Sequence, residues 1–418
     1  MIFTDESEKL ERASAYVEEL EAYVSQLEAL HNEHHKGSDN SNINKFDYVE
    51  RNCILGATDI MLDTMLLSLP AKQVLNGAGA GSIEEKAATA VASMNAMEGM
   101  MELFYQHKGL NVNAEKELDR FPKQHLNIRY QRMFSGAFMY AAGNHIGIEW
   151  NECAGMVNCT PVSADENGRY ESGRYFGWGI AHEIGHCINQ GAYAVAEVTN
   201  NYFAQLAQAK DSNASVRFKY NNIYDKVTSG TTGSASNVFT QLGMYWQLRS
   251  AYDSDYNYKT YEDRGEQLQS LFFARVDSYA RDASLAPAPG GVALTLGGGS
   301  DQNIMRLACA AAEKDLLEFF ERWGKVPDSE TVSYASQFEK ETRALYYSDD
   351  DSRVYRIENP EGGSLGTGGN VSAVGADTAA VIDSADPSRV NITLTSENIP
   401  EEEVLGYEIV RCMISGGE

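Results

Sequence analysis

The stretch Gly177-Trp-Gly-Ile-Ala-His-Glu-Ile-Gly-His-Cys-Ile-Asn-Gln190 decides how the rest of the chain is interpreted. It contains a complete H-E-x-x-H sequence, in which His182 and His186 are four residues apart. In a helix with 3.6 residues per turn the two imidazoles lie about 40° apart, so both can reach one metal ion. Glu183 follows His182 by about 100°, which predicts a carboxylate beside the metal, where a general base is needed.

The motif alone is a hypothesis, because the same residues would suit a buried helix with two hydrogen-bonded histidines. Two features favour a metal site. The approach over residues 175–181 is apolar and holds two glycines, which suits a buried helix with close backbone neighbours. Gly185 costs a helix roughly 1 kcal/mol relative to Ala, which indicates tight packing at that position.

A third ligand is predicted soon after the motif. Gly191 is expected to end the helix, and a new helical run is predicted from about Tyr193. Glu197 on that run follows His186 closely enough for a turn back onto the first helix. Two histidines and one glutamate form a catalytic zinc set with one position open for water. Asn201, on the same helical face as Glu197, is either a hydrogen-bond partner of a histidine ligand or an ordinary polar residue.

With these residues the chain resembles the enhancin-like family of zinc metallopeptidases. That family includes viral enhancins and secreted or surface bacterial proteases that act on mucins and other glycoproteins. The resemblance rests on the metal motif followed by Glu197-Val-Thr-Asn-Asn201, and it covers roughly residues 45 to 345. Softer matches lie at Asp59–Ala71, Phe138–Ile148, Phe239–Leu248 and Leu317–Gly324.

The resemblance implies a gluzincin in which His182, His186 and Glu197 hold one Zn²⁺ and Glu183 is the general base of peptide-bond hydrolysis. It also implies a mucin-like or other glycoprotein substrate and a secreted or cell-surface location in a bacterium. The N-terminus shows no signal peptide, so an excised or truncated chain is expected. Two other functions stay open: a non-catalytic glycoprotein- or carbohydrate-binding module on the same fold, and a non-haem iron enzyme.

Composition limits the partners of the 418-residue chain. A net charge of −26 argues against nucleic acid or an anionic membrane surface. No apolar run is long enough to span a bilayer. A monomer is expected. The six cysteines have no paired metal spacing, and Cys153 and Cys159 form either a small disulfide loop or two free thiols.

Periodicity predicts an α+β, predominantly α catalytic domain. Helices are expected over residues 5–35, 52–69 and 82–108, the last with a Met-rich core stripe. The period changes between Gln124 and Trp150, where short strands are expected. Phe138–Ile148 is the candidate edge strand for holding substrate. The oxyanion needs a further donor, for which His145 and Tyr245 are candidates, although either can equally be a structural residue.

Four more helices are expected in the second half. They are placed near residues 236–252, 261–283, 302–323 and 328–347, and a loop is expected at 221–234. His31 and His35 share one face of the first helix and form a rival metal site. Glu33 lies about 200° from His31 and cannot serve it as a base, so a solvated helix end is the simpler interpretation.

We expect four segments along the chain. Residues 1–44 are predicted to form an N-terminal helix packed on the catalytic unit, and residues 45–360 the catalytic domain. Residues 361–376 form a Gly/Ser-rich linker. Residues 377–418 are predicted to form a short β segment that resembles part of a fibronectin-like module.

Overall fold

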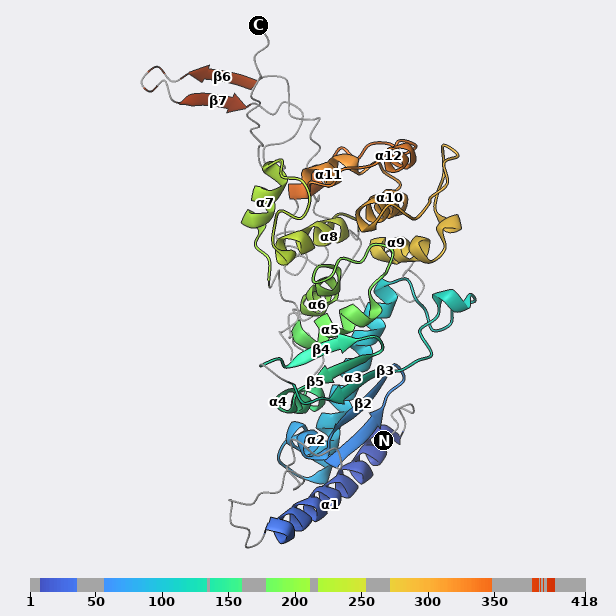
Figure 1. Ribbon diagram of the computed structural model, residues 1–418, viewed down its shortest axis with the longest axis vertical. Helices are drawn as coiled ribbons and strands as arrows, with labels where there is room; N and C mark the ends of the chain where they lie inside the picture. Colours follow the sequence, from blue (N-terminus) through green and yellow to red (C-terminus); the bar gives the residue numbers. More distant parts are fainter. Residues whose placement is uncertain are drawn as a thin grey trace, which may run out of the picture.

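The computed structural model describes residues 8–35, 56–133, 136–159, 178–210, 217–252 and 271–347, together with parts of 378–394. In Figure 1 the sheet and the first helices occupy one end of an elongated molecule, and the later helices occupy the other. The motif helix α5 (Trp178–Ile188) lies between these two ends. The predicted fold class, α+β and predominantly α, is confirmed.

A five-stranded sheet of order β1-β2-β3-β5-β4 forms the first end. Its strands are β1 (Ala57–Met61), β2 (Met65–Pro70), β3 (Leu126–Tyr130), β4 (Met139–Ala142) and β5 (His145–Ile148). The three central strands run parallel, and β1 and β4 pair with them antiparallel at the two edges. Leu67, Ile128 and Ile146 are in register across the central strands and are fully buried, so they form one layer of the core.

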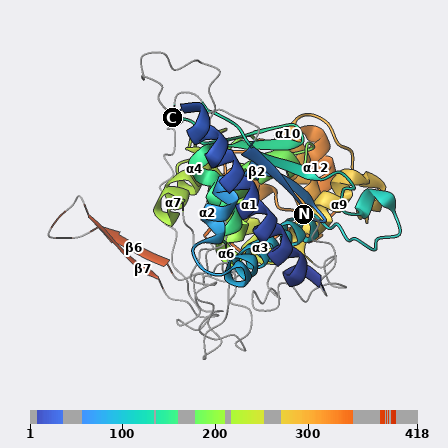
Figure 2. The same ribbon diagram turned by 90° about the horizontal axis from the view of Figure 1, so that it is seen from below.

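Three helices pack with this sheet: α1 (Lys9–His35), α2 (Ala71–Ala78) and α3 (Ile83–His107). Seen from below, α1 crosses the end of the molecule over α2 and α3 (Figure 2). On α1, Ala13, Val17 and Leu20 are buried, while Leu10 is exposed. The long first helix is therefore a packed element of this end and not a free coiled coil.

Helix α3 agrees closely with its prediction. Its N-terminus is a capping box, in which the Ser82 side chain accepts a hydrogen bond from the Glu85 backbone N–H and the Glu85 carboxylate accepts one from the Ser82 backbone N–H. The methionines expected in its core stripe are buried: Met94, Met97, Met100 and Met101.

The helix predicted over residues 52–69 is wrong. Its described part forms the β1–β2 hairpin, in which Met65, Leu67 and Leu69 are fully buried at alternate positions. Ser68 points to the other face and donates a 2.7 Å hydrogen bond to Asp59 on the neighbouring strand. A short apolar run is compatible with the repeat of a helix or of a strand, and here pairing with a neighbouring strand favours the strand.

The later helices enclose a second hydrophobic cluster. They are α7 (Tyr220–Thr228), α8 (Val238–Tyr252), α9 (Phe272–Arg281), α10 (Ser300–Ala312), α11 (Leu317–Arg322) and α12 (Ser329–Ala335). Three predictions are corrected here. Helix α7 replaces the loop expected at 221–234, the single helix expected at 302–323 is broken near Glu313, and the last helix ends at Ala335.

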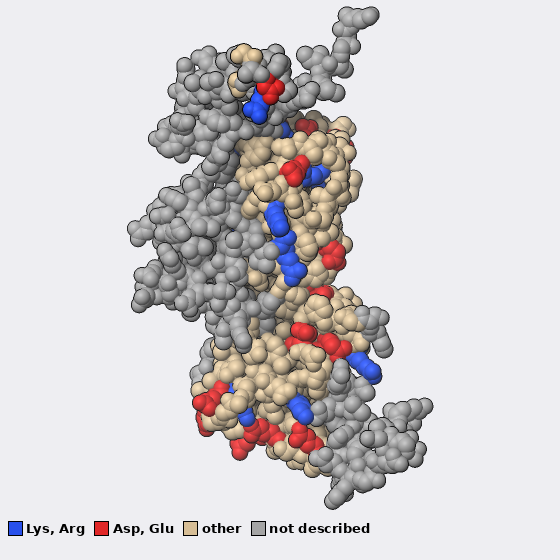
Figure 3. Space-filling model, turned by 90° about the vertical axis from the view of Figure 1, so that its left-hand side faces the viewer, with Lys and Arg blue, Asp and Glu red and all other residues tan. Residues whose placement is uncertain are grey.

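Two further features concern the surface and the C-terminal segment. On the face in Figure 3, acidic side chains gather over the end that holds α1 and the sheet. Strands β6 (Thr378–Ile382) and β7 (Val390–Leu394) pair antiparallel, whereas the expected linker and residues 395–418 of the expected β segment lie outside the described residues. Within the described ranges, no helix has the length and apolarity needed to cross a membrane. Cys153 and Cys159 are free, buried thiols.

Candidate metal centre

Helix α5 lies with one face in the core and carries the motif histidines on another. Ile180, Ala181 and Ile184 are buried in the cluster around the sheet. His182 and His186 are only partly buried, and their rings stand 4.8 Å apart in an edge-to-face arrangement. The helical spacing therefore places both imidazoles on one accessible side of a well-anchored helix.

The structure brings Glu197 next to both histidines. Its Oε2 lies 3.3 Å from His182 Nε2, and its Oε1 lies 3.2 Å from His186 Nε2. Among the described residues, this is the one group of three or more His, Cys, Asp or Glu side chains close enough to share an ion. Zinc bonds of about 2.0–2.2 Å to nitrogen and oxygen suit donors spaced in this way, so the donor set fits a zinc ion.

Asn201 fixes the tautomer of His182. Its Nδ2 donates to the Glu197 carbonyl oxygen at 2.6 Å, which leaves Oδ1 as the acceptor at the other end of the amide. That oxygen accepts from Trp178 Nε1 at 2.8 Å and from His182 Nδ1 at 2.6 Å. His182 Nδ1 therefore carries the proton, and the lone pair of its Nε2 faces Glu197. The hydrogen bond expected between Asn201 and a histidine is present.

Glu197 lies in a turn before helix α6 (Thr199–Lys210), and not within a helix as predicted. Its φ is +61°, an uncommon value for a residue other than glycine. Hydrogen bonds close the turn around it: the backbone N–H groups of Val198 and Thr199 both donate to the Val195 carbonyl oxygen at 3.0 Å. The strained residue is thus held by its neighbours in the position where its carboxylate reaches the histidines.

Asn200 is a site residue that sequence reasoning missed. It is fully buried, and its Nδ2 lies 3.0 Å from His186 Nε2 and 3.3 Å from His182 Nε2. Its Oδ1 has no hydrogen-bond partner among the described residues. The sequence signal for it is the pair of asparagines after Glu197, Asn200 and Asn201. A helix that starts at Thr199 instead of Tyr193 turns both amides toward α5.

Glu183 lies one residue after His182 on α5 and is half-buried. Burial raises the pKa of its carboxyl group, and the negative charge of Glu197 raises it further, while His182 acts in the opposite direction. A raised pKa makes this carboxylate a stronger base than an exposed glutamate, which suits a group that accepts and returns a proton in hydrolysis.

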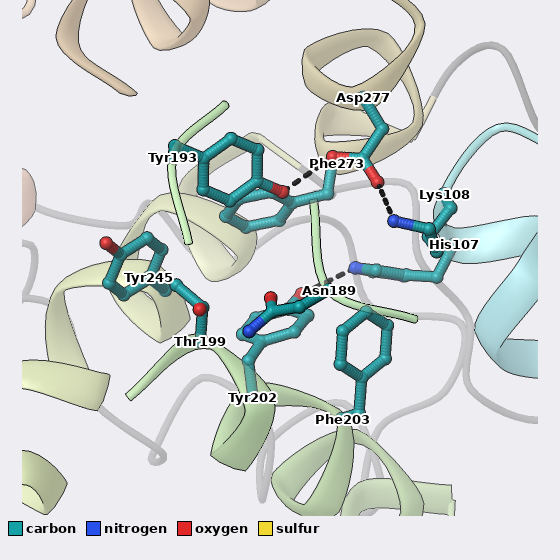
Figure 4. A pocket seen from close by; sticks show the side chains of 10 residues that line it. All are labelled: His107, Lys108, Asn189, Tyr193, Thr199, Tyr202, Phe203, Tyr245, Phe273 and Asp277. Carbon is teal, nitrogen blue, oxygen red and sulfur yellow. Dashed lines mark hydrogen bonds and ion pairs between the residues drawn. The ribbon is translucent and has the colours of Figure 1, made fainter. Parts of the chain in front are cut away.

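The two oxyanion candidates are not in contact with the metal group. His145 bonds to the Tyr140 hydroxyl at 3.1 Å, and the β4–β5 register puts both on one face. Met139, on the opposite face, lies against Gly179 of α5. Tyr245 is buried in α8 and lines a separate pocket (Figure 4). Their role stays a prediction. The side chains of His31 and His35 lie outside the described ones.

The fold and this centre define the chain as a metallopeptidase domain. Residues 85–324 match the family model described as peptidase M60, enhancin and enhancin-like, and the chain belongs to this family. The expected resemblance is confirmed. No curated protein sequence matches the chain.

Several solved structures share the fold. The M60 catalytic domain of Clostridium perfringens ZmpC, in complex with the sialyl T antigen, has a TM-score of 0.56 at 19% identity, covering 96% of this chain and 65% of that one. A metallopeptidase in complex with Tn antigen has a TM-score of 0.52 at 16% identity over 82% and 65% of the two chains. A functionally unknown Bacillus anthracis protein has a TM-score of 0.51 at 17% identity over 71% and 54%. The chain thus spans about half to two thirds of the length of these proteins.

Proposed function

We propose that this chain is a zinc-dependent endopeptidase that cleaves glycosylated, mucin-type proteins outside a bacterial cell. The observation that carries the proposal is the convergence of His182, His186 and Glu197, with Glu183 on the same helix as the histidines. In this assignment the first three residues hold the metal and Glu183 handles protons. A set of two histidines and one glutamate with an open position is typical of catalytic zinc.

The metal supplies Lewis acidity when bound: it polarises the scissile carbonyl group and lowers the pKa of a coordinated water toward about 7. The chain's own residues do the rest. Glu183 accepts a proton from the attacking water and later donates it to the nitrogen of the leaving amine. Asn201 keeps His182 in the tautomer whose Nε2 can bind a metal, through the hydrogen bond to Nδ1.

Strand β4 is the proposed platform for the substrate backbone. It is the last strand in the order of the described sheet, so one of its edges has no partner in that sheet. It lies beside the metal-motif helix, because Met139 and Phe138 both approach Gly179 of α5. Phe138, the residue directly before this strand, is 54% exposed. An extended peptide that added to this edge would pass close to the first turn of α5 and could pack on Phe138.

The proposed glycoprotein substrate is supported by two of the solved relatives, which are complexes with the sialyl T antigen and the Tn antigen. Those ligands belong to those proteins, and their chains are less than 25% identical to this one. Family membership supports peptide-bond hydrolysis, and the net charge of −26 suits neither nucleic acid nor an anionic membrane as partner.

A digest of a glycosylated mucin fragment tests the proposal. We expect cleavage at peptide bonds beside glycosylated residues, read by mass spectrometry, which a zinc chelator abolishes and added zinc restores. The same fragment stripped of glycans is the matched control, and it should be cleaved much more slowly. Equal cleavage of both would remove the glycoprotein assignment, and cleavage that resists chelation would remove the zinc assignment.

A further inference from the structure

A pocket lies next to the segment that carries Glu197, because Tyr193 and Thr199, which flank Glu197 in sequence, both line it. Its walls come from the end of α3, the segment between α5 and α6, and helices α6, α8 and α9 (Figure 4). Several of its polar side chains point toward one another instead of toward solvent. The pocket therefore joins the sheet end of the molecule, the metal-carrying segment and the later helices.

Asp277 of α9 is the shared acceptor in this pocket. Its Oδ2 accepts from Lys108 Nζ at 2.7 Å, and its Oδ1 accepts from the Tyr193 hydroxyl at 2.6 Å. The three residues come from three separate parts of the chain: Lys108 from the end of α3, Tyr193 from the segment after α5, and Asp277 from α9. We call them the Asp277 clamp.

The clamp is buried, so its bonds are strong and costly to break. Asp277 is 2% exposed, and Tyr193 and Lys108 are also buried. Burial and the carboxylate of Asp277 raise the pKa of Tyr193 well above its usual value, so the hydroxyl stays a donor. A charge in this position needs its partner, since an isolated buried carboxylate or ammonium is strongly destabilising.

Short, bonded steps connect Tyr193 to Glu197. Val195 donates its backbone N–H to Thr199 Oγ1 at 3.0 Å, and its carbonyl oxygen accepts from that hydroxyl at 3.1 Å. Two residues on, the Glu197 carbonyl oxygen accepts from Asn201. Tyr193 is therefore tied to α9, whereas Val195 and Glu197 are both tied to the first turn of α6.

A second bond holds the same segment to the later helices. Asn303 of α10 donates from Nδ2 to the Ala192 carbonyl oxygen at 2.7 Å. Two neighbouring residues, Ala192 and Tyr193, are thus attached to two helices of the second hydrophobic cluster. Helix α5, by contrast, is buried in the cluster around the sheet. The segment before Glu197 is accordingly bonded to the second cluster, while the helix that carries the two histidines packs in the first.

We propose that the Asp277 clamp positions Glu197, so that the affinity of the site for zinc depends on how the two hydrophobic clusters are docked. Asp277 and Tyr193 are positioning residues in this proposal, because neither touches the metal group. The inference rests on the proposed metal centre. A strained turn at Glu197 would relax if its anchor at Tyr193 were released, and its carboxylate would then spend less time beside the histidines.

Tyr193→Phe tests the clamp in the full chain, because it removes one hydroxyl and keeps the ring. Zinc affinity is measured by competition with a chelator, and the melting temperature of the metal-free protein is measured in parallel. We expect zinc to bind about tenfold more weakly, at the low end of what outer residues of metal sites contribute. Tyr334→Phe is the matched control, since Tyr334 is also buried and donates one 2.8 Å bond to the Pro287 carbonyl oxygen.

The comparison separates positioning from simple stability. Both variants lose one buried hydrogen bond, so both metal-free proteins should melt slightly earlier. Only Tyr193→Phe should lose zinc affinity, while Tyr334→Phe should stay within about twofold of the wild type. Equal zinc affinity in the two variants would overturn the proposal.

A double variant addresses the buried charges. Asp277→Asn alone leaves Lys108 without its counter-charge and is expected to destabilise the fold. Asp277→Asn combined with Lys108→Met removes both charges and keeps an amide oxygen as acceptor for Tyr193. We expect this pair to restore zinc affinity to within about threefold of the wild type. If the double variant bound zinc as weakly as Tyr193→Phe, the hydrogen bond from Tyr193 to residue 277 would not be what positions Glu197.

One more variant distinguishes failure of the clamp from failure of the metal centre. Glu197→Ala should abolish tight zinc binding if the centre is as proposed. Weaker zinc binding by Glu197→Ala, together with wild-type zinc affinity in Tyr193→Phe, would contradict the role of the Asp277 clamp and leave the metal centre in place. Wild-type zinc affinity in Glu197→Ala would contradict the proposed metal centre, and therefore also the role of the Asp277 clamp.

Discussion

Gly185 of the metal-motif helix lies directly against the backbone of Asn200 on α6. A Cβ at Gly185 would stand 2.9 Å from Asn200 Cα and closer still to its carbonyl oxygen. Helices α5 and α6 can pack this closely only because residue 185 has no side chain. The contact sets the distance between the helix that carries the histidines and the helix that follows Glu197.

Gly185→Ala should therefore force the two helices apart, because the obstacle is backbone and cannot turn away. We expect a loss of about 1–3 kcal/mol in the free energy of unfolding, as for other overpacked cores, together with weaker zinc binding. Chemical denaturation and chelator competition measure the two effects. Gly155→Ala is the control, because a Cβ at Gly155 would meet nothing within 4 Å. A Gly185→Ala protein as stable as this control would contradict the packing argument.

Asn201→Leu should weaken zinc binding by about 10- to 100-fold, the range found for residues that orient metal ligands. Without its amide, His182 Nδ1 loses its acceptor, and the proton can move to Nε2, where it would block the metal. Histidine tautomers in the metal-free protein can be read from ¹⁵N chemical shifts. The prediction fails if Nδ1 of His182 keeps its proton in the variant and zinc affinity is unchanged.

His107 should make the fold less stable as the pH falls. Burial lowers its pKa well below the usual value, and Arg249 and Lys108 lower it further, so the folded protein holds it neutral. The unfolded chain binds a proton below about pH 6.5, so protonation favours unfolding under that pH. Between pH 7.5 and 5.5 this group alone should remove about 1.4 kcal/mol from the free energy of unfolding.

His107→Gln is the variant that isolates this effect, because glutamine does not titrate and can still bond to Tyr202. Urea denaturation at pH 7.5 and pH 5.5 gives the change in the free energy of unfolding for each protein. The variant should lose less stability on acidification than the wild type. Identical pH dependence in the two proteins would show that His107 is protonated in the folded state or contributes nothing.

A chain that ends near Pro360 should stay folded and cleave a small peptide at an undiminished rate, with weaker binding of a large glycoprotein. Among the described strands, β6 and β7 pair only with each other and not with the five-stranded sheet. Thermal melting decides the question. A large drop in melting temperature, or insolubility, would show that the β segment belongs to the catalytic core.

The sequence was most informative where spacing alone fixes geometry. The motif on α5 needs only the helical repeat to bring two imidazoles together, and the capping box at Ser82 specifies a helix start without help from the rest of the chain. The short distance along the chain from His186 also predicts Glu197 as a neighbour of the histidines. Its φ of +61° was not foreseeable, since it depends on the bonds that Thr199 donates to Val195 and Asn201 donates to Glu197.

Where the predicted secondary structure was wrong, tertiary contacts determined which structure forms. The asparagine-rich start of residues 221–234 favours a turn, yet α7 forms there because Ile223 and Val227 fall on one buried face. The helix predicted over residues 52–69 instead forms, in its described part, the β1–β2 hairpin. The contacts of Asp277 could not be predicted from the sequence, because its partners lie far away along the chain and meet it only in the folded protein.

The proton-handling role of Glu183 is the central claim, and one paired measurement tests it most directly. Wild-type protein and Glu183→Gln are assayed together for zinc content by elemental analysis and for cleavage of the glycosylated mucin fragment by mass spectrometry. The proposed mechanism predicts one zinc per chain in both proteins and a loss of at least about 10²–10⁴-fold in the cleavage rate of the variant. Near-normal cleavage by Glu183→Gln with zinc fully bound would contradict it.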